Sequence, residues 1–215
     1  MSAVLQSVLK TYRDLQSYSD SGIVTVEVES IGKKFGGEKK LLTGTVFATN
    51  FMRNALPSAA AERHLFRYQF TSTGHFAELR EDNLYFICNN HEGVFKRLPE
   101  EGLTPSSSLA VAVADTAALS FAGSYYSASL LMTDIVSDKQ WFFNRLTDLE
   151  VVNSDEQIHL RAKIKDGLVD LFVDSERLTF VEMIVARPTS TAKFVWQDTV
   201  LDGEINTRIF DQYRF

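Results

Sequence analysis

Residues 157–164 read QIHLRAKI, a stretch in which polar and apolar side chains alternate without a break. A period of two is typical of a β-strand that has one face buried and one face in water. The turn signal Lys165-Asp166-Gly167 follows, and the apolar-rich run 168–173 comes directly after it. Because so short a connection joins antiparallel neighbours, the pattern predicts a β-hairpin within an antiparallel sheet.

Further strands are predicted on both sides of this hairpin. β-Branched and aromatic runs recur between clusters of Gly, Pro, Asn and Asp. These runs predict strands over 23–28, 41–51, 64–70, 75–80, 84–88, 94–98, 178–186, 192–200 and 205–210. Most of the intervals are too short for anything but hairpins, so we expect about ten strands in one curved antiparallel sheet.

Helices are predicted at the start and in the middle of the chain. Apolar residues spaced by three and four predict a helix over 2–18, ended by the turn signal Asp20-Ser21-Gly22. Thr104-Pro105-Ser106 is typical of a helix start, and an Ala-rich run follows it, with a second short helix predicted over 125–132. We expect these helices to cover an apolar face of the sheet, giving an α+β fold that is mainly antiparallel β.

Composition limits the class of protein. The 215 residues contain no linker or repeat, so a single domain over 1–215 is expected. A net charge of −6 without clustered basic residues argues against a nucleic-acid partner. Cys88 is the sole cysteine, so no intrachain disulfide can form. No apolar run is long enough for a transmembrane helix and no signal peptide is recognised, which fits a cytosolic protein or an exported one without its leader.

Motifs for catalysis, metals and cofactors are missing from the sequence. His91-Glu92 begins like a zinc-binding helix, but no second His follows at the required spacing. Gly36-Gly37 lacks the Gly-Lys-Ser/Thr ending that binds phosphates. We therefore predict no catalytic residue, no metal ligand and no cofactor. Lipid binding needs no such motif, because burying each CH₂ group contributes ~0.8 kcal/mol without any directed hydrogen bond.

Several stretches resemble one known family in their order along the chain. They are 11–22 (TYRDLQSYSDSG), 66–70 (FRYQF), 108–114 (SLAVAVA), 171–178 (LFVDSERL) and 203–210 (GEINTRIF). The chain thus resembles the LolA/LolB-like lipoprotein-carrier superfamily, most closely its uncharacterised exported branch. The resemblance implies a half-barrel whose concave apolar face is closed by helices over 106–132 and holds a lipid, such as lipoprotein acyl chains. It also implies a periplasmic or exported protein.

Three functional hypotheses follow. The leading one is a non-enzymatic protein that binds a lipid or other lipophilic small molecule, or a lipoprotein, between sheet and helices. The predicted cavity lining is Phe66, Tyr68, Phe70, Phe86, Leu109, Val113, Tyr125, Leu130, Leu160, Phe172, Phe194 and Trp196. The second is a structural or protein-interaction module with a packed interior. The third is an enzyme for a hydrophobic substrate, with His64, Glu27 and Tyr68 brought together by folding. The sequence leaves the ligand and the oligomeric state open.

Overall fold

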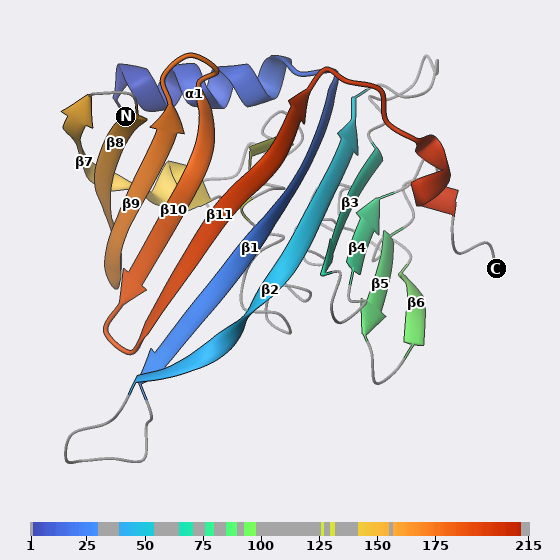
Figure 1. Cartoon of the computed structure of the whole chain (residues 1–215), viewed down its shortest axis with the longest axis horizontal. Coiled ribbons are helices and arrows are strands. Elements are labelled where there is room, and N and C mark those ends of the chain that lie inside the picture. The colour runs from blue at the N-terminus through green and yellow to red at the C-terminus, as the bar shows by residue number, and fades with distance from the viewer. Residues whose placement is uncertain are drawn as a thin grey trace, which may run out of the picture.

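The chain folds into one open, curved β-sheet in the computed structural model (Figure 1). The structure describes residues 2–29, 39–53, 65–70, 76–79, 85–89, 93–97, 126, 130–131, 142–154 and 157–211. These residues form eleven strands in the order β6-β5-β4-β3-β2-β1-β11-β10-β9-β8-β7. All neighbouring strands are antiparallel, and β6 and β7 are the edges, so the described sheet does not close.

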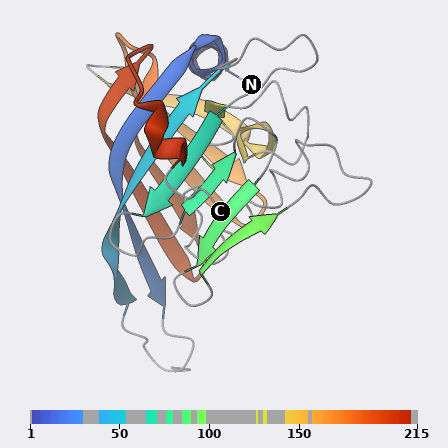
Figure 2. The same cartoon turned by 90° about the vertical axis from the view of Figure 1, so that its right-hand side faces the viewer.

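Two meanders make up this sheet. The strands are β1 (Ser17–Glu29), β2 (Lys39–Met52), β3 (Leu65–Phe70), β4 (Phe76–Leu79), β5 (Tyr85–Asn89), β6 (Gly93–Arg97), β7 (Thr147–Ser154), β8 (Gln157–Ile164), β9 (Gly167–Asp174), β10 (Thr179–Arg187) and β11 (Ser190–Leu201). Pairing of β1 with β11 joins the N-terminal meander to the C-terminal one. Figure 2 shows the sheet curving around one side, where α1 and η1 lie.

The hairpin predicted from QIHLRAKI is confirmed as β8 and β9. Ile164 pairs with Gly167, so the turn is Lys165-Asp166. Leu160 is fully buried, whereas Arg161 is exposed and donates from Nε to Asp170 Oδ1 over 2.8 Å. The alternation in the sequence therefore gives the buried and wet faces correctly.

Helix α1 (Ala3–Asp14) lies across one end of the sheet (Figure 1). Ser2 caps it by accepting a hydrogen bond on Oγ from the Leu5 N–H, at 3.3 Å. Leu5, Val8 and Tyr12 are completely buried, as their spacing predicts. The amphipathic stripe thus packs α1 onto the sheet.

The end of the first helix was predicted wrongly. The expected turn Asp20-Ser21-Gly22 lies inside β1, which begins at Ser17. Asp20 fits in a buried strand because its carboxyl group accepts two hydrogen bonds there. Gly22 is required because the ring of Phe47 packs directly over it, and a Cβ on Gly22 would lie 2.4 Å from Phe47 Cζ. Residues typical of turns therefore serve interior contacts in this strand.

The strand predicted over 205–210 is also wrong, since this segment contains the 3₁₀ helix η2 (Thr207–Asp211). Asn206 starts it by accepting a hydrogen bond on Oδ1 from the Arg208 N–H, at 3.1 Å. Arg67 in β3 then donates from Nη1 to the Ile209 carbonyl over 3.2 Å. This contact places η2 on the outer face of the sheet, opposite α1. The sequence assigned no range to β7, which takes the place of the strand wrongly predicted over 205–210, so the described residues form eleven strands where about ten were expected.

Most of the predicted mid-chain helices lie outside the described residues. Tyr126, Leu130 and Leu131 are described, and all three are helical and buried. The short 3₁₀ helix η1 (Phe142–Arg145) follows and buries Phe142 and Phe143. With α1, these residues form the described cover of the sheet's inner face.

Candidate ligand-binding face

A continuous apolar surface, here called the inner face, runs across the sheet. Its buried side chains come from β1, β2, β3, β8, β9, β10 and β11 and alternate with outward-facing residues along each strand. The principal members are Tyr18, Val24, Val26, Phe47, Phe51, Phe66, Tyr68, Leu160, Val169, Leu171, Val173, Phe180, Met183, Val185, Phe194 and Trp196. Strands far apart in the sequence thus contribute to one surface.

Aromatic rings from four strands, two on each side of β1, meet on the inner face. Phe47 of β2 stacks on Tyr68 of β3, with ring centroids 5.5 Å apart, and meets Trp196 of β11 edge-on at 6.4 Å. Trp196 also lies 6.3 Å from Phe194 and 6.1 Å from Phe180. β1 passes between Phe47 and Trp196 with Gly22, so the missing side chain lets the two rings meet. The centre of the inner face is therefore an aromatic floor.

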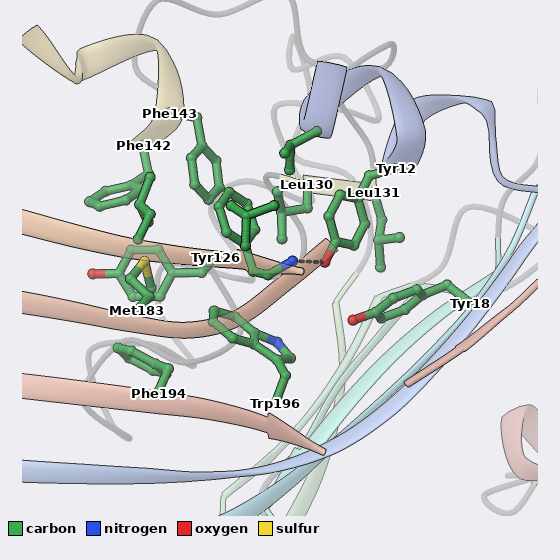
Figure 3. Close-up of a cluster of buried hydrophobic side chains, with 14 of the residues drawn as sticks. Tyr12, Tyr18, Tyr126, Leu130, Leu131, Phe142, Phe143, Met183, Phe194 and Trp196 are labelled. Carbon is green, nitrogen blue, oxygen red and sulfur yellow. Dashed lines mark hydrogen bonds between the residues drawn. The ribbon is translucent and has the colours of Figure 1, made fainter. Parts of the chain in front are cut away.

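The cover meets this floor through further rings (Figure 3). Tyr126 lies edge-on to Phe194, with centroids 4.9 Å apart, and edge-on to Phe142 at 4.5 Å. Phe143 stacks on Phe180 at 5.4 Å. The floor and the cover therefore meet through edge-to-face and stacked rings, the arrangements that aromatic pairs prefer.

One end of the inner face, beneath α1, carries a polar cluster of Tyr12, Tyr18, Asp20 and Thr49. The Phe180 N–H donates to Tyr12 Oη over 3.0 Å, the dashed bond in Figure 3. Tyr18 Oη donates to Asp20 Oδ2 over 2.6 Å, and the Thr49 N–H donates to Asp20 Oδ1 over 3.0 Å. The rings of Tyr12 and Tyr18 are 5.6 Å apart. This cluster links the helix to the sheet.

Burial changes the acid–base behaviour of this cluster. Desolvation raises the pKa of Asp20 to about 6, although hydrogen bonds from Tyr18 and Thr49 act in the opposite direction. Desolvation also raises the pKa of Tyr12, Tyr18 and Tyr68 above the usual value, with a further contribution from the Asp20 charge. The tyrosines therefore remain neutral hydrogen-bonding groups at physiological pH, while Asp20 can change charge.

Trp196 presents a buried polar atom that no group of the described residues satisfies. Its side chain is 7% exposed, and Nε1 has no hydrogen-bond partner among the described residues. An indole nitrogen can only donate, so it needs an acceptor. A buried donor without one costs about 1–3 kcal/mol.

Arg53, just beyond β2, joins the cover to the sheet. Its Nε donates to the Leu15 carbonyl over 2.9 Å, and its Nη2 donates to the Leu131 carbonyl over 3.0 Å. Its guanidinium also lies 5.2 Å from the Phe51 ring centroid. Sequence reasoning missed Arg53 because a single arginine after a strand carries no local signal of these contacts.

All of the predicted lining residues except Phe172 fall into three groups. Those that lie together, on the inner face or in its cover, are Phe66, Tyr68, Leu130, Leu160, Phe194 and Trp196. Phe70 pairs with Phe47 in the β2–β3 register, and Phe86 belongs to β5, but their side chains lie outside the described part. Leu109, Val113 and Tyr125 are not among the described residues.

Phe172 needs a correction. It lies on the outer face of β9, because its neighbours Leu171 and Val173 point inward and are fully buried. There it stacks on the His159 imidazole, with ring centroids 4.4 Å apart. The hairpin pairs His159 with Phe172, and paired residues of neighbouring strands point to the same face. His159 is one of the polar residues that alternate toward water in β8, so its position could have assigned Phe172 to the outer face.

The groups of the enzyme hypothesis do not converge where the structure describes them. Glu27 alternates with the inward Val26 and so lies on the outer face of β1, whereas Tyr68 lies on the inner face. His64 is outside the described residues. Within the described ranges, no group of His, Cys, Asp and Glu could hold a metal ion. None of the described helices has the length and apolar character needed to cross a membrane.

Comparison with known proteins finds similarity only at the level of solved structures. No family model and no curated protein matches the chain. A chain of the Pseudomonas aeruginosa MucA/MucB complex is similar over 96% of this chain, with 10% identity and a TM-score of 0.49. This chain spans 59% of the length of that one.

Two further similar structures match over nearly their whole length. The Mycobacterium tuberculosis lipoprotein LppX has 8% identity and a TM-score of 0.45, covering 95% of this chain and 96% of its own. A putative outer membrane lipoprotein-sorting protein domain from Vibrio parahaemolyticus has 7% identity and a TM-score of 0.39, covering 97% of this chain and 95% of its own. All three likenesses are between structures alone, at 7–10% sequence identity.

Proposed function

We propose that this chain is a non-enzymatic binding protein that holds a lipophilic molecule with an acyl chain between the inner face and its cover. The supporting observation is the aromatic floor from Tyr68 to Phe180, faced by a cover whose contacts are themselves aromatic rings. Rings on both sides provide apolar surface for a hydrocarbon chain that enters as the cover moves.

The energetics of acyl-chain burial suit such a face. Each buried CH₂ contributes ~0.8 kcal/mol, so a long acyl chain gains on the order of 10 kcal/mol. Opening the cover costs the ring contacts of Tyr126 and Phe143 and the hydrogen bond from Arg53 to Leu131. Aromatic contacts contribute ~0.5–1.5 kcal/mol each beyond their buried area, so an acyl chain can offset this cost.

The wider proposal is a single-domain carrier over residues 1–215 that acts in the periplasm or outside the cell. The resemblance to lipoprotein carriers supports this compartment and suggests the acyl chains of a lipoprotein as cargo. In this proposal the helical residues Tyr126, Leu130 and Leu131 belong to a movable lid.

The test is whether the purified protein carries and exchanges a lipophile. We expect native mass spectrometry and solvent extraction to detect a bound lipid, and a hydrophobic dye to be displaced by fatty acyl compounds. Phe194→Ala should weaken dye binding at least about tenfold, because it removes a floor ring that contacts Tyr126. Val200→Ala, at an exposed position of the same strand, is the matched control and should bind normally. Absence of both bound lipid and dye displacement would refute the proposal.

A structural or interaction module is the second candidate, favoured by the close contact between floor and cover. Phe180, Phe194 and Phe143 are each at most 3% exposed. A protein that binds no lipophile at all and unfolds cooperatively at high temperature would support this reading.

A further inference from the structure

We propose that the ligand is a neutral acyl ester or amide whose carbonyl oxygen accepts a hydrogen bond from Trp196 Nε1. This inference rests on the proposed function and specifies its ligand class. It starts from the indole N–H, which is buried in the aromatic floor and has no acceptor among the described residues. A plain hydrocarbon would leave that donor unsatisfied, whereas a carbonyl group would satisfy it.

The surroundings of Trp196 divide the ligand into two parts. The rings of Phe47, Phe180 and Phe194 lie around the indole and suit an acyl chain. The indole nitrogen is on the side of the ring that faces Tyr18 in Figure 3, toward the polar cluster under α1. A carbonyl at this boundary therefore places the acyl chain over the floor and the polar end of the molecule beneath the helix.

The nearby carboxyl group favours a neutral ligand over a fatty-acid anion. Trp196 pairs with Gly22 on β1, and Asp20 lies on the same face of that strand one inward position away. Tyr18 and the Thr49 N–H already donate to the Asp20 carboxyl group. A second carboxylate placed here would meet like charge in a low-dielectric interior, whereas an ester carbonyl carries no net charge.

The experiment compares methyl laurate, the alkane tetradecane of the same chain length, and laurate, each delivered from cyclodextrin. We expect the wild-type protein to bind methyl laurate more tightly than the other two. Trp196→Phe keeps an aromatic ring and removes the N–H, so its affinity for methyl laurate should fall about 2- to 12-fold while that for tetradecane stays within about twofold. Val195→Ala, on the other face of the same strand, is the matched control and should keep the preference for the ester.

A spectroscopic measurement on unmutated Trp196 keeps the test valid if the phenylalanine variant does not fold. The chain has two tryptophans, so the indole N–H resonance that persists in Trp141→Phe belongs to Trp196. Methyl laurate should shift this resonance downfield and tetradecane should not. If both compounds bind equally and the resonance does not respond to the ester, this inference is overturned while lipophile binding stands. If neither compound binds, the proposed function itself fails.

Discussion

Asp20→Asn is the substitution with the clearest pH signature. Burial raises the pKa of Asp20 in the folded protein from the ordinary 3.8 to about 6. The folded state therefore holds this proton more tightly than the unfolded state does. The stabilisation that comes from this tighter proton binding is fully present below about pH 4, is lost as the pH rises toward about 6, and is absent above that. Each pKa unit corresponds to about 1.4 kcal/mol, so the free energy of unfolding falls by on the order of 3 kcal/mol as Asp20 loses its proton.

The assay is urea unfolding of the wild-type protein and of Asp20→Asn at intervals from about pH 4 to about pH 8. Subtracting one free energy of unfolding from the other cancels the titration of all other groups. We expect the asparagine variant to gain up to about 3 kcal/mol relative to wild type across this range. The altered hydrogen bond with Tyr18 adds a constant offset, so only the change with pH is diagnostic.

Asp14→Asn serves as the control of opposite sign. Asp14 is exposed, and its hydrogen bond with the Lys10 ammonium lowers the pKa of its carboxyl group. Its contribution is present above the unfolded pKa of 3.8 and disappears only as the pH falls below that value. The difference between wild type and this variant should therefore stay nearly constant over the range used for Asp20→Asn, and wild type should lose stability relative to Asp14→Asn only when the series is extended below about pH 4. A difference curve for Asp20→Asn that is flat, or that favours wild type as pH rises, would refute a buried and desolvated Asp20.

Two further substitutions test the packing under the floor and the helix. Gly22→Ala should lower the free energy of unfolding by about 1–3 kcal/mol, because its Cβ would lie 2.4 Å from Phe47 Cζ and 2.5 Å from the Val195 carbonyl oxygen. Gly44→Ala is the control, since the nearest atom to its Cβ would be 3.2 Å away. Equal thermal stabilities of the two variants would contradict the packing of Phe47 over Gly22. Tyr12→Phe should cost about 1–3 kcal/mol in urea unfolding by leaving the buried Phe180 N–H without its acceptor, and an unchanged free energy would show that this hydrogen bond is dispensable.

Local patterns predicted the sheet well where a rule of short range applies. The alternation in QIHLRAKI and the turn after it gave the β8–β9 hairpin, because side chains alternate by stereochemistry along any strand. The same rule would have placed Phe172 outward, had its register with His159 been followed through the turn. Turn-type residues misled at Asp20, because hydrogen bonding by Tyr18 and Thr49 overrides the local preference.

The sequence by itself thus determined the β8–β9 hairpin and its buried face, most of the other strands and the amphipathic stripe of the first helix, since these depend on residues a few positions apart. Only the tertiary structure decided what lies together on the inner face. Tyr12 meets the Phe180 N–H, Arg53 meets the Leu131 carbonyl, and Trp196 is buried without an acceptor in the part of the chain that the structure describes. Pairing of β1 with β11 brings the two halves of the chain together, and no local pattern encodes contacts across so many residues.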